Sequence, residues 1–172
     1  IKCLFLRKID ISTNVSRIPE KGPGKESPVS RSHYVRNKPS TIGAAIQAIA
    51  QGRVIIVMDD ENRENEGDFI CAAEKISSEI VNFMITHGRG LLCVAILPEV
   101  CQRLDLPPIV EHNTAPLGTN FTVPVDHCTC RTGITAEERA QTIGRLVDPT
   151  SQPSEFVRPG HVYPLRAMEG GV

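Results

Sequence analysis

The chain has 172 residues, of which 40% are hydrophobic and 23% are charged, as in an ordinary globular protein. This length allows one domain with a full core and leaves little room for two. Residues 1–40 carry nine Lys and Arg against three Asp and Glu, so residues 41–172 carry −7 of the total charge of −1. A negative main part argues against nucleic-acid binding, and no apolar run approaches the ~18 residues of a membrane-spanning helix.

Residues 1–40 differ in composition from the rest of the chain. They contain four prolines and the polar run PEKGPGKESPVSRS, and they show no sustained apolar period. Such a segment buries too little apolar surface to offset its ordering entropy, which predicts a disordered or extraneous leader. Its basic, acid-poor character also fits a transit peptide. Because the first residue is Ile1, we expect the sequence to begin inside a longer reading frame.

Regular structure is predicted from Thr41 onward. Thr41 can cap a helix with apolar residues at helical spacing, and Gly52 can end it. The almost continuous Val/Ile run of residues 53–58 predicts a strand buried on both faces, and residues 69–73 predict a second strand.

Helices and strands are expected to alternate in the remainder. The predicted elements are a helix opened by Ser77, a strand at 91–97, a short helix from Pro98, a strand at 120–125, a helix from Thr135 to about Val147 and a strand at 162–165. The helix at Thr135 begins with the capping-box pattern TAEE, in which Glu138 reaches back. Some connections are short enough for hairpins, so we expect a mixed sheet with helices on its faces.

The six cysteines include no Cys-x-x-Cys pair, and two of them lie inside apolar runs. This pattern favours reduced, mostly buried thiols and a cytosolic type of compartment. Cys128 and Cys130 follow His127, but their spacing is not that of a zinc knuckle and no second half is present, so zinc is not expected there.

The stretch DDENRENEGD, residues 59–68, holds six carboxylates and Arg63 between two apolar runs. An acidic turn between strands is often only a solvated loop. Carboxylates crowded on a rigid frame, however, repel one another unless a cation lies among them or some stay protonated. Hard oxygen donors are the ligands that Mg²⁺ prefers, so a metal or acid–base site is the alternative to a solvated turn.

This stretch resembles the signature of the 3,4-dihydroxy-2-butanone 4-phosphate synthases, enzymes of riboflavin biosynthesis. Further segments match the family in the same order, and together they cover about residues 41–172 and none of residues 1–40. These segments are THGRGLLCV (86–94), RLDLPPIVEHNT (103–114), GTNFTVPVD (118–126), TGITAEERAQTI (132–143) and RPGHVYPLRAMEGGV (158–172).

The resemblance implies a lyase that converts D-ribulose 5-phosphate to L-3,4-dihydroxy-2-butanone 4-phosphate and formate, with Mg²⁺ or Mn²⁺ as cofactor. It also implies a cytoplasmic homodimer with sites near the subunit interface, or an organellar one if residues 1–40 are a transit peptide. The implied fold is a three-layer α/β sandwich whose mixed central sheet is flanked by helices. Many relatives carry a GTP cyclohydrolase II domain downstream, so a fusion to such a domain is an expected partner.

Site residues follow from the same resemblance. Glu64 matches the metal-ligand glutamate and a substrate contact, and Arg63 matches a substrate-binding arginine. Asp68 matches a substrate-binding and catalytic aspartate, and Glu66 is the expected proton carrier. His161 matches a histidine that the family needs for activity.

Two further positions keep two interpretations each. Thr132 is expected to line the substrate pocket, or else to belong to a plain turn before a helix. Cys93 matches a recurrent pocket cysteine, and a core cysteine in a strand is the equal alternative.

The segment EGGV (169–172) is followed in the family by stretches that supply the second metal ligand, phosphate-binding groups and a further glutamate. The sequence of residues 1–172 has no replacement for them, so the domain is expected to be truncated at the C-terminus and the fragment inactive or nearly so. The alternative function is a catalytically silent relative that binds a sugar phosphate or Mg²⁺ or serves in dimerisation.

Overall fold

A single mixed sheet organises the chain. The computed structural model describes residues 3–9, 40–60, 62 and 66–168. Its six strands lie in the order β2-β3-β1-β4-β6-β5. They are β1 (Cys3–Ile9), β2 (Ile55–Met58), β3 (Gly67–Ala72), β4 (Leu92–Ile96), β5 (Val125–His127) and β6 (Phe156–Arg166). Only β4 and β6 pair in parallel, while the other four neighbouring pairs are antiparallel.

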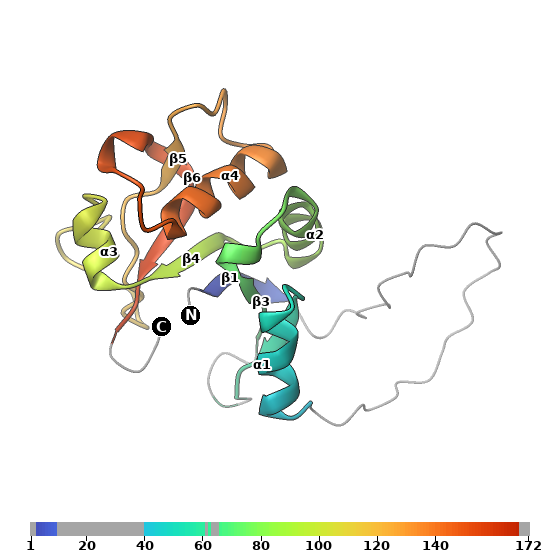
Figure 1. The fold of residues 1–172 in the computed structure, drawn as a ribbon. Coiled ribbons are helices and arrows are strands. Elements are labelled where there is room, and N and C mark those ends of the chain that lie inside the picture. The colour runs from blue at the N-terminus through green and yellow to red at the C-terminus, as the bar shows by residue number, and fades with distance from the viewer. Residues whose placement is uncertain (1–2, 10–39, 61, 63–65, 169–172) are drawn as a thin grey trace.

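Helices cover both faces of this sheet, as the resemblance implied. The α-helices are α1 (Ile42–Ala50), α2 (Ser78–Gly88), α3 (Pro98–Arg103) and α4 (Ala136–Val147), and two 3₁₀ turns are η1 (Ala73–Lys75) and η2 (Pro153–Glu155). Figure 1 shows α2 and α4 together on one side of the sheet and α1 on the other. The expected three-layer α/β arrangement with a mixed central sheet is therefore confirmed.

The main core lies between the sheet and the layer of α2 and α4. Alternate residues of β3 and β4 point into it, which is the period expected of strands that present one face to a core. The largest of the almost completely buried side chains are Met84, Leu92, Ile96, Leu104, Ile143, Leu146, Val81, Val94, Val125 and Val162. Among the described residues, no helix is both long and apolar enough to cross a bilayer.

The helix starts agree with the capping residues read from the sequence. The hydroxyl of Thr41 accepts a hydrogen bond from the backbone N–H of Ala44, and that of Ser77 accepts one from Ile80. Thr135 accepts from the N–H of Glu138 at 3.1 Å. Each bond satisfies an N–H of the first turn that has no partner inside the helix.

Two expected strands differ from the structure. The segment at 53–58 was expected to be buried on both faces, but β2 is an edge strand whose Ile56, Val57 and Met58 are exposed. An edge strand has a neighbour on one side only, which the apolar run by itself does not reveal. In the expected strand at 120–125, only isolated bridges from Phe121 and Thr122 form, and the regular strand β5 begins at Val125.

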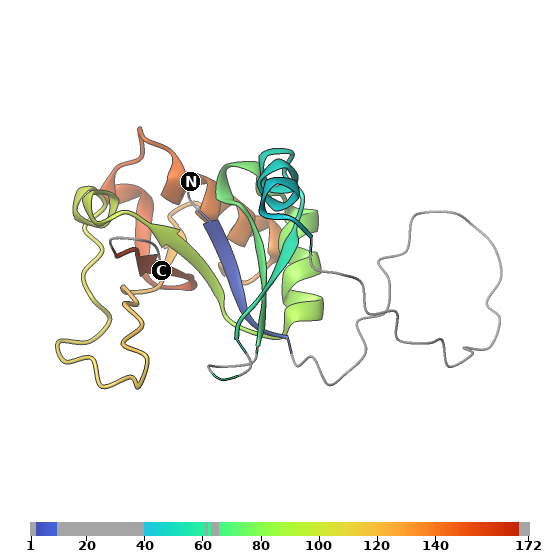
Figure 2. The same ribbon diagram turned by 90° about the horizontal axis from the view of Figure 1, so that it is seen from below.

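The first forty residues hold a strand that was not expected. Cys3–Ile9 form β1, which pairs with β3 on one side and β4 on the other. Residues 10–39 lie outside the described residues. Figure 2 shows β1, in blue, in the middle of the sheet. Its sequence CLFLRKI is short and apolar, and a strand in this position depends on partners that are far away along the chain.

Candidate functional site

The clearest polar arrangement pairs His161 with Asp126. His161 lies on β6 and Asp126 lies on the neighbouring strand β5. The Nδ1 of His161 is 2.7 Å from one carboxylate oxygen of Asp126, and the backbone N–H of His161 donates to the other oxygen at 2.9 Å. The Asp126 side chain is 7% exposed and that of His161 is 42% exposed. A buried carboxylate thus fixes the ring of a histidine that still reaches solvent, which leaves the other ring nitrogen available for proton transfer.

Two glycines pack closely against Asp126, one against its carboxylate and one against its backbone. Gly133 has φ +73°, and a Cβ there would overlap the side chain of Asp126. A Cβ at Gly160 would overlap the backbone of Val125 and Asp126. The motifs TGIT and RPGH therefore need glycine for close approach to the same aspartate, and Gly133 also needs its left-handed backbone.

Glu138 holds the turn that carries Thr132. Its carboxylate accepts from the backbone N–H of Arg131 at 2.6 Å and from the hydroxyls of Thr132 and Thr135 at 3.2 and 3.3 Å. These donors, led by the N–H of Arg131, lower the pKa of Glu138 below its ordinary value. Thr132 is exposed, and the next residue, Gly133, packs on Asp126, so Thr132 lies beside the His161–Asp126 pair.

The acidic stretch forms the connection between β2 and β3. The backbone N–H of Asp59 donates to the carbonyl of Glu66, which closes the hairpin, and Asp60 accepts two hydrogen bonds from Asn62. Asp68 is half-buried in β3, opposite Val57. Arg63 and Glu64, the expected substrate and metal residues, lie outside the described residues.

Asp68 and His161 lie at the same end of the sheet and on the same face. Phe69 of β3, Leu92 of β4 and Val162 of β6 form a row of core side chains, which the strand registers align through β1. Asp68 and His161 each come one residue before a member of this row. Strand alternation turns both away from that core, toward the face that bears α1. Three strand spacings of about 4.8 Å separate their backbones by roughly 14 Å. The structure brings the two residues to one surface without placing them in contact.

Cys93 occupies β4 between these two positions. Its alternation places it on the same face as Asp68 and His161, but it is fully buried, and its thiol is 3.5 Å from the carbonyl of Leu91. This burial fits the interpretation of a core cysteine as well as that of a residue beneath a pocket.

The described residues include side chains of the type that bind a divalent cation, but these side chains do not converge into a metal site. Asp59, Asp60, Glu66 and Asp68 supply oxygen ligands of the kind that Mg²⁺ prefers. Within residues 3–9, 40–60, 62 and 66–168, no three His, Cys, Asp or Glu side chains converge closely enough to hold a metal ion.

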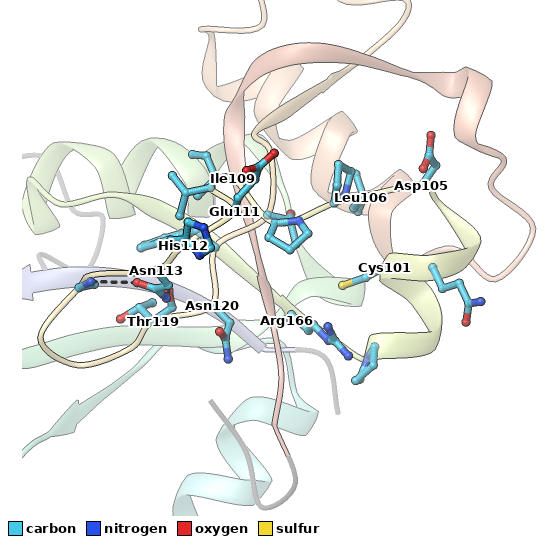
Figure 3. A pocket seen from close by; sticks show the side chains of 18 of the residues that line it. Cys101, Asp105, Leu106, Ile109, Glu111, His112, Asn113, Thr119, Asn120 and Arg166 are labelled. Atoms are coloured by element: carbon cyan, nitrogen blue, oxygen red, sulfur yellow. Dashed lines mark hydrogen bonds between the residues drawn. The ribbon is translucent and has the colours of Figure 1, made fainter.

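A large cavity lies elsewhere, at the other end of β6. It has a volume of about 880 Å³ and is lined by α3, by the loop of residues 105–115 and by Thr119–Thr122. Figure 3 shows Arg166, at the end of β6, between α3 and the loop. None of the expected site residues that the structure describes lines it. The cavity is therefore separate from the His161–Asp126 pair.

Sequence reasoning did not single out Asp126 as a functional residue. Asp126 ends the segment GTNFTVPVD, yet its partner His161 is 35 residues away. Glu138 was expected to cap a helix, and the hydrogen bonds that it accepts from Arg131 and Thr132 were not predicted. An acidic residue at the end of an apolar strand was the available signal for Asp126, although many such residues are only solvated.

A mixed sheet between helix layers, with a buried aspartate orienting a solvent-exposed histidine on the sheet face that also carries Asp68, defines an α/β protein whose candidate site has side chains of the types used in acid–base chemistry. The model of the 3,4-dihydroxy-2-butanone 4-phosphate synthase family matches residues 43–172. The chain belongs to this family, whose members are lyases of riboflavin biosynthesis.

Individual relatives agree with this assignment. Over 131 residues, the chain is 58% identical to the riboflavin biosynthesis protein RibBA of Bacillus mycoides (strain KBAB4). The aligned region covers 76% of this chain and 33% of that protein. The chain is 54% identical over the same length to RibBA of Bacillus subtilis (strain 168). The chain therefore spans about a third of the length of these curated relatives.

Solved structures of similar fold carry related names. A crystal structure of 3,4-dihydroxy-2-butanone 4-phosphate synthase in complex with two magnesium ions superposes with a TM-score of 0.75 at 47% identity, covering 77% of this chain and 62% of that one. The two-domain synthase RibBX from A. baumannii gives a TM-score of 0.73 at 42% identity, with 77% and 39% covered.

Proposed function

We propose that the protein containing this chain converts D-ribulose 5-phosphate to L-3,4-dihydroxy-2-butanone 4-phosphate and formate. The reaction enolises the ketose, expels water, shifts the carbon skeleton and adds water to release formate, so it needs no external oxidant or reductant. Every stage moves a proton to or from oxygen or carbon. The single observation that carries the proposal is the exposed imidazole of His161 held by buried Asp126 within the family-matched residues.

In this proposal, the surroundings of each described residue determine its role in the reaction. His161 would carry protons, and Asp126 would hold the ring in one orientation and stabilise its protonated form. Asp68, on the same sheet face, would contact the sugar hydroxyls, and Thr132 would line the pocket beside the histidine. Cys93 would lie at the bottom of the pocket, between Asp68 and His161.

The remaining roles belong to the acidic hairpin. Arg63 would bind the anionic substrate, Glu64 would hold the metal ion and contact substrate, and Glu66 would carry a proton. A divalent ion, Mg²⁺ or Mn²⁺, would polarise the oxygens of the sugar and stabilise negative charge on them when bound. The carboxylate donor set and the two magnesium ions named for a structural relative support this cofactor.

Formate release tests the proposal. The complete reading frame that contains residues 1–172 would be purified, supplied with ribulose 5-phosphate and Mg²⁺, and followed by a formate-specific assay. We expect turnover that disappears with a chelator and returns with Mg²⁺. The absence of formate, with substrate still bound, would support a catalytically silent binding module and would contradict the proposal.

Variants of the same protein separate the residues. His161→Ala should lower turnover by about 10²–10⁴-fold, the usual share of a general acid–base group. Glu64→Ala should abolish the response to Mg²⁺, because it removes the proposed ligand. His112→Ala, in the exposed loop beside the separate cavity, is the matched control and should retain activity.

The assembly and the location are further parts of the proposal. We expect a cytoplasmic homodimer, or an organellar one if residues 1–40 are a transit peptide. The RibBA relatives are about three times as long as the matched region, which is consistent with a fusion to a GTP cyclohydrolase II domain. No nucleic acid or membrane partner is proposed.

A further inference from the structure

Two cysteines belong to the turn that follows β5. His127 ends the strand, and the backbone N–H of Cys130 donates to the carbonyl of His127 at 2.9 Å, which closes a four-residue turn. Cys128 and Cys130 lie in this turn with only Thr129 between them. Because the chain bends here, their Cα atoms are roughly 5.5–7 Å apart, which overlaps the range that a disulfide requires.

The two thiols have different surroundings. Cys128 is exposed to solvent. The Sγ of Cys130 points to α4, where it is 3.6 Å from the carbonyl oxygen of Glu138 and 3.7 Å from the hydroxyl of Thr142. Burial raises the pKa of the Cys130 thiol above its ordinary value. An accessible thiol next to a more shielded one is the arrangement of an attacking and a resolving cysteine.

The same helix holds the segment between Cys130 and the candidate site. The backbone N–H and the hydroxyl of Thr132 donate to the carboxylate of Glu138 at 3.4 and 3.2 Å, and the Cys130 thiol contacts the carbonyl of the same glutamate. Gly133 follows and packs against the carboxylate of Asp126. A movement of the Cys130 side chain away from α4 therefore acts at short range on the turn that supports Asp126.

We propose that Cys128 and Cys130 are a reversible redox pair whose disulfide releases the turn of residues 131–133 from α4. In the oxidised pair the sulfur of Cys130 is bonded to Cys128 and has left its contacts with the helix. Disulfides of reducing compartments are usually transient and redox-sensing, which agrees with a pair that is reduced in the resting protein. The formation of this bond is independent of the proposed function, whereas its effect on turnover rests on that function.

A hydroperoxide is the oxidant of this reaction. The Cys128 thiolate attacks one oxygen of hydrogen peroxide, the O–O bond breaks, and the departing hydroxide takes the thiol proton to become water. The sulfur of Cys130 then attacks the resulting sulfenic acid, the S–O bond breaks, and a second water leaves with the second thiol proton. Two thiols and one peroxide thus give one disulfide and two waters. An added dithiol reverses the reaction by thiol–disulfide exchange.

Thiol mapping tests the disulfide. The complete protein that contains residues 1–172 would be treated with a small excess of hydrogen peroxide, unfolded, alkylated and digested with trypsin. Cleavage after Arg103 and Arg131 releases residues 104–131, which contain Cys128 and Cys130 and no other cysteine. We expect this peptide to carry two alkyl groups before oxidation and none after it, with a mass lower by two hydrogen atoms than that of the free dithiol. Dithiothreitol should restore both thiols.

Single substitutions are the matched controls. Cys128→Ser and Cys130→Ser each leave one thiol without its partner, so neither variant should lose the two hydrogen atoms. The buried thiols of Cys71, Cys93 and Cys101 are the internal reference and should stay reduced. The redox pair would be overturned if its thiols oxidised no faster than these buried ones. Oxidation of Cys128 only to its acids, or a link to a second chain in place of the internal bond, would also overturn it.

Amide hydrogen exchange tests the release of the turn. The N–H groups of Arg131 and Thr132 donate to Glu138 in the reduced protein. We expect their exchange to become at least about tenfold faster in the oxidised protein and to slow again with dithiothreitol, because a local opening exposes them. Cys128→Ser, treated in the same way, should show no change. Equal exchange in the two redox forms, with the disulfide present, would overturn the release.

Formate release then connects the pair to the candidate site. Oxidation should lower the turnover of ribulose 5-phosphate in the complete protein and dithiothreitol should restore it, while Cys128→Ser should stay active throughout. Full turnover in the oxidised form would overturn the control of the site by this pair. The absence of formate in both forms would contradict the proposed function alone, because thiol mapping and hydrogen exchange report on the pair without substrate.

Discussion

Among single residues, one buried carboxylate organises the candidate site. Asp126 accepts two hydrogen bonds from His161, Gly133 packs against its carboxylate, and Gly160 packs against its backbone. A carboxylate in such a place costs free energy unless its acceptors are satisfied, and the histidine supplies both donors. The arrangement therefore holds the ring of His161 in one orientation.

Asp126→Asn tests this orientation. The amide keeps the size of the side chain but removes the charge that stabilises a protonated imidazole, so we expect turnover to fall by about 10²–10⁴-fold. Formate release by the complete protein measures the loss, and circular dichroism checks the fold. Asp105→Asn, at an exposed position with φ +52° that asparagine tolerates, is the control. Equal activity in the two variants would contradict a role for Asp126.

Gly133→Ala tests the space around the carboxylate. The new Cβ overlaps Asp126 and the backbone has φ +73°, so we expect the free energy of unfolding to fall by about 2 kcal/mol or more. The control is Gly144→Ala in α4, where nothing lies within 4 Å of the added carbon, and where alanine should stabilise by about 0.5–1 kcal/mol. Urea midpoints measure both, and similar values would show that the glycine at 133 is not required.

At the scale of elements, an ionic cluster fastens the end of α4 to the start of β6. Arg145 on α4 donates to Asp148 at 2.6 Å and to Glu155 of η2 at 2.6 Å, and all three side chains are about 30% exposed. The hydrogen bond from Arg145, followed by the N–H of Gln152, lowers the pKa of Glu155 below its ordinary value. Solvent weakens each ion pair, so the cluster is expected to orient these elements more than to stabilise the fold.

The pH dependence of stability follows from this lowered pKa. Because Glu155 binds a proton less readily in the folded state, its contribution is fully present above the unfolded-state pKa of about 4.3 and is lost as the pH falls through the folded-state value. We expect Arg145→Met to lower the urea midpoint at pH 7, and we expect this difference to shrink as the pH falls below about 4.3 and through the folded-state pKa. Arg53→Met, which is exposed, is the control. A midpoint difference that is independent of pH would contradict the assignment.

At the scale of the whole molecule, apolar side chains remain on the surface in more than one place. Ile42 and Ile46 of α1 are 80% and 57% exposed, and Leu117 in the loop near the separate cavity is 51% exposed. Exposed apolar groups of this size are common at subunit interfaces. They are consistent with the proposed homodimer.

Light scattering tests that assembly. The chain of 18.8 kDa should elute with a mass of about 38 kDa, twice its own. The dimer should persist in 0.5 M NaCl if apolar contacts hold it, because salt screens only the charged ones. A mass of one chain at all concentrations tested would contradict the homodimer.

The order and type of most elements could be predicted from the amino-acid sequence alone. Thr41, Ser77 and Thr135 marked the helix starts because capping is a local hydrogen bond between neighbours in the chain. The motifs also identified the family, since six segments in one order carry more information than their local structure. His161 was predicted as a site residue, and the structure gives it a buried carboxylate partner.

The contacts between distant residues became known from the folded structure and not from the sequence. The partnership of Asp126 with His161, the edge position of β2 and the insertion of β1 between β3 and β4 all join segments distant in the chain. No local pattern contains such information, because strand pairing depends on which other edges are available in the folded sheet. An apolar run predicts that a segment will be buried or paired, but its pairing partners depend on the other strands of the folded sheet.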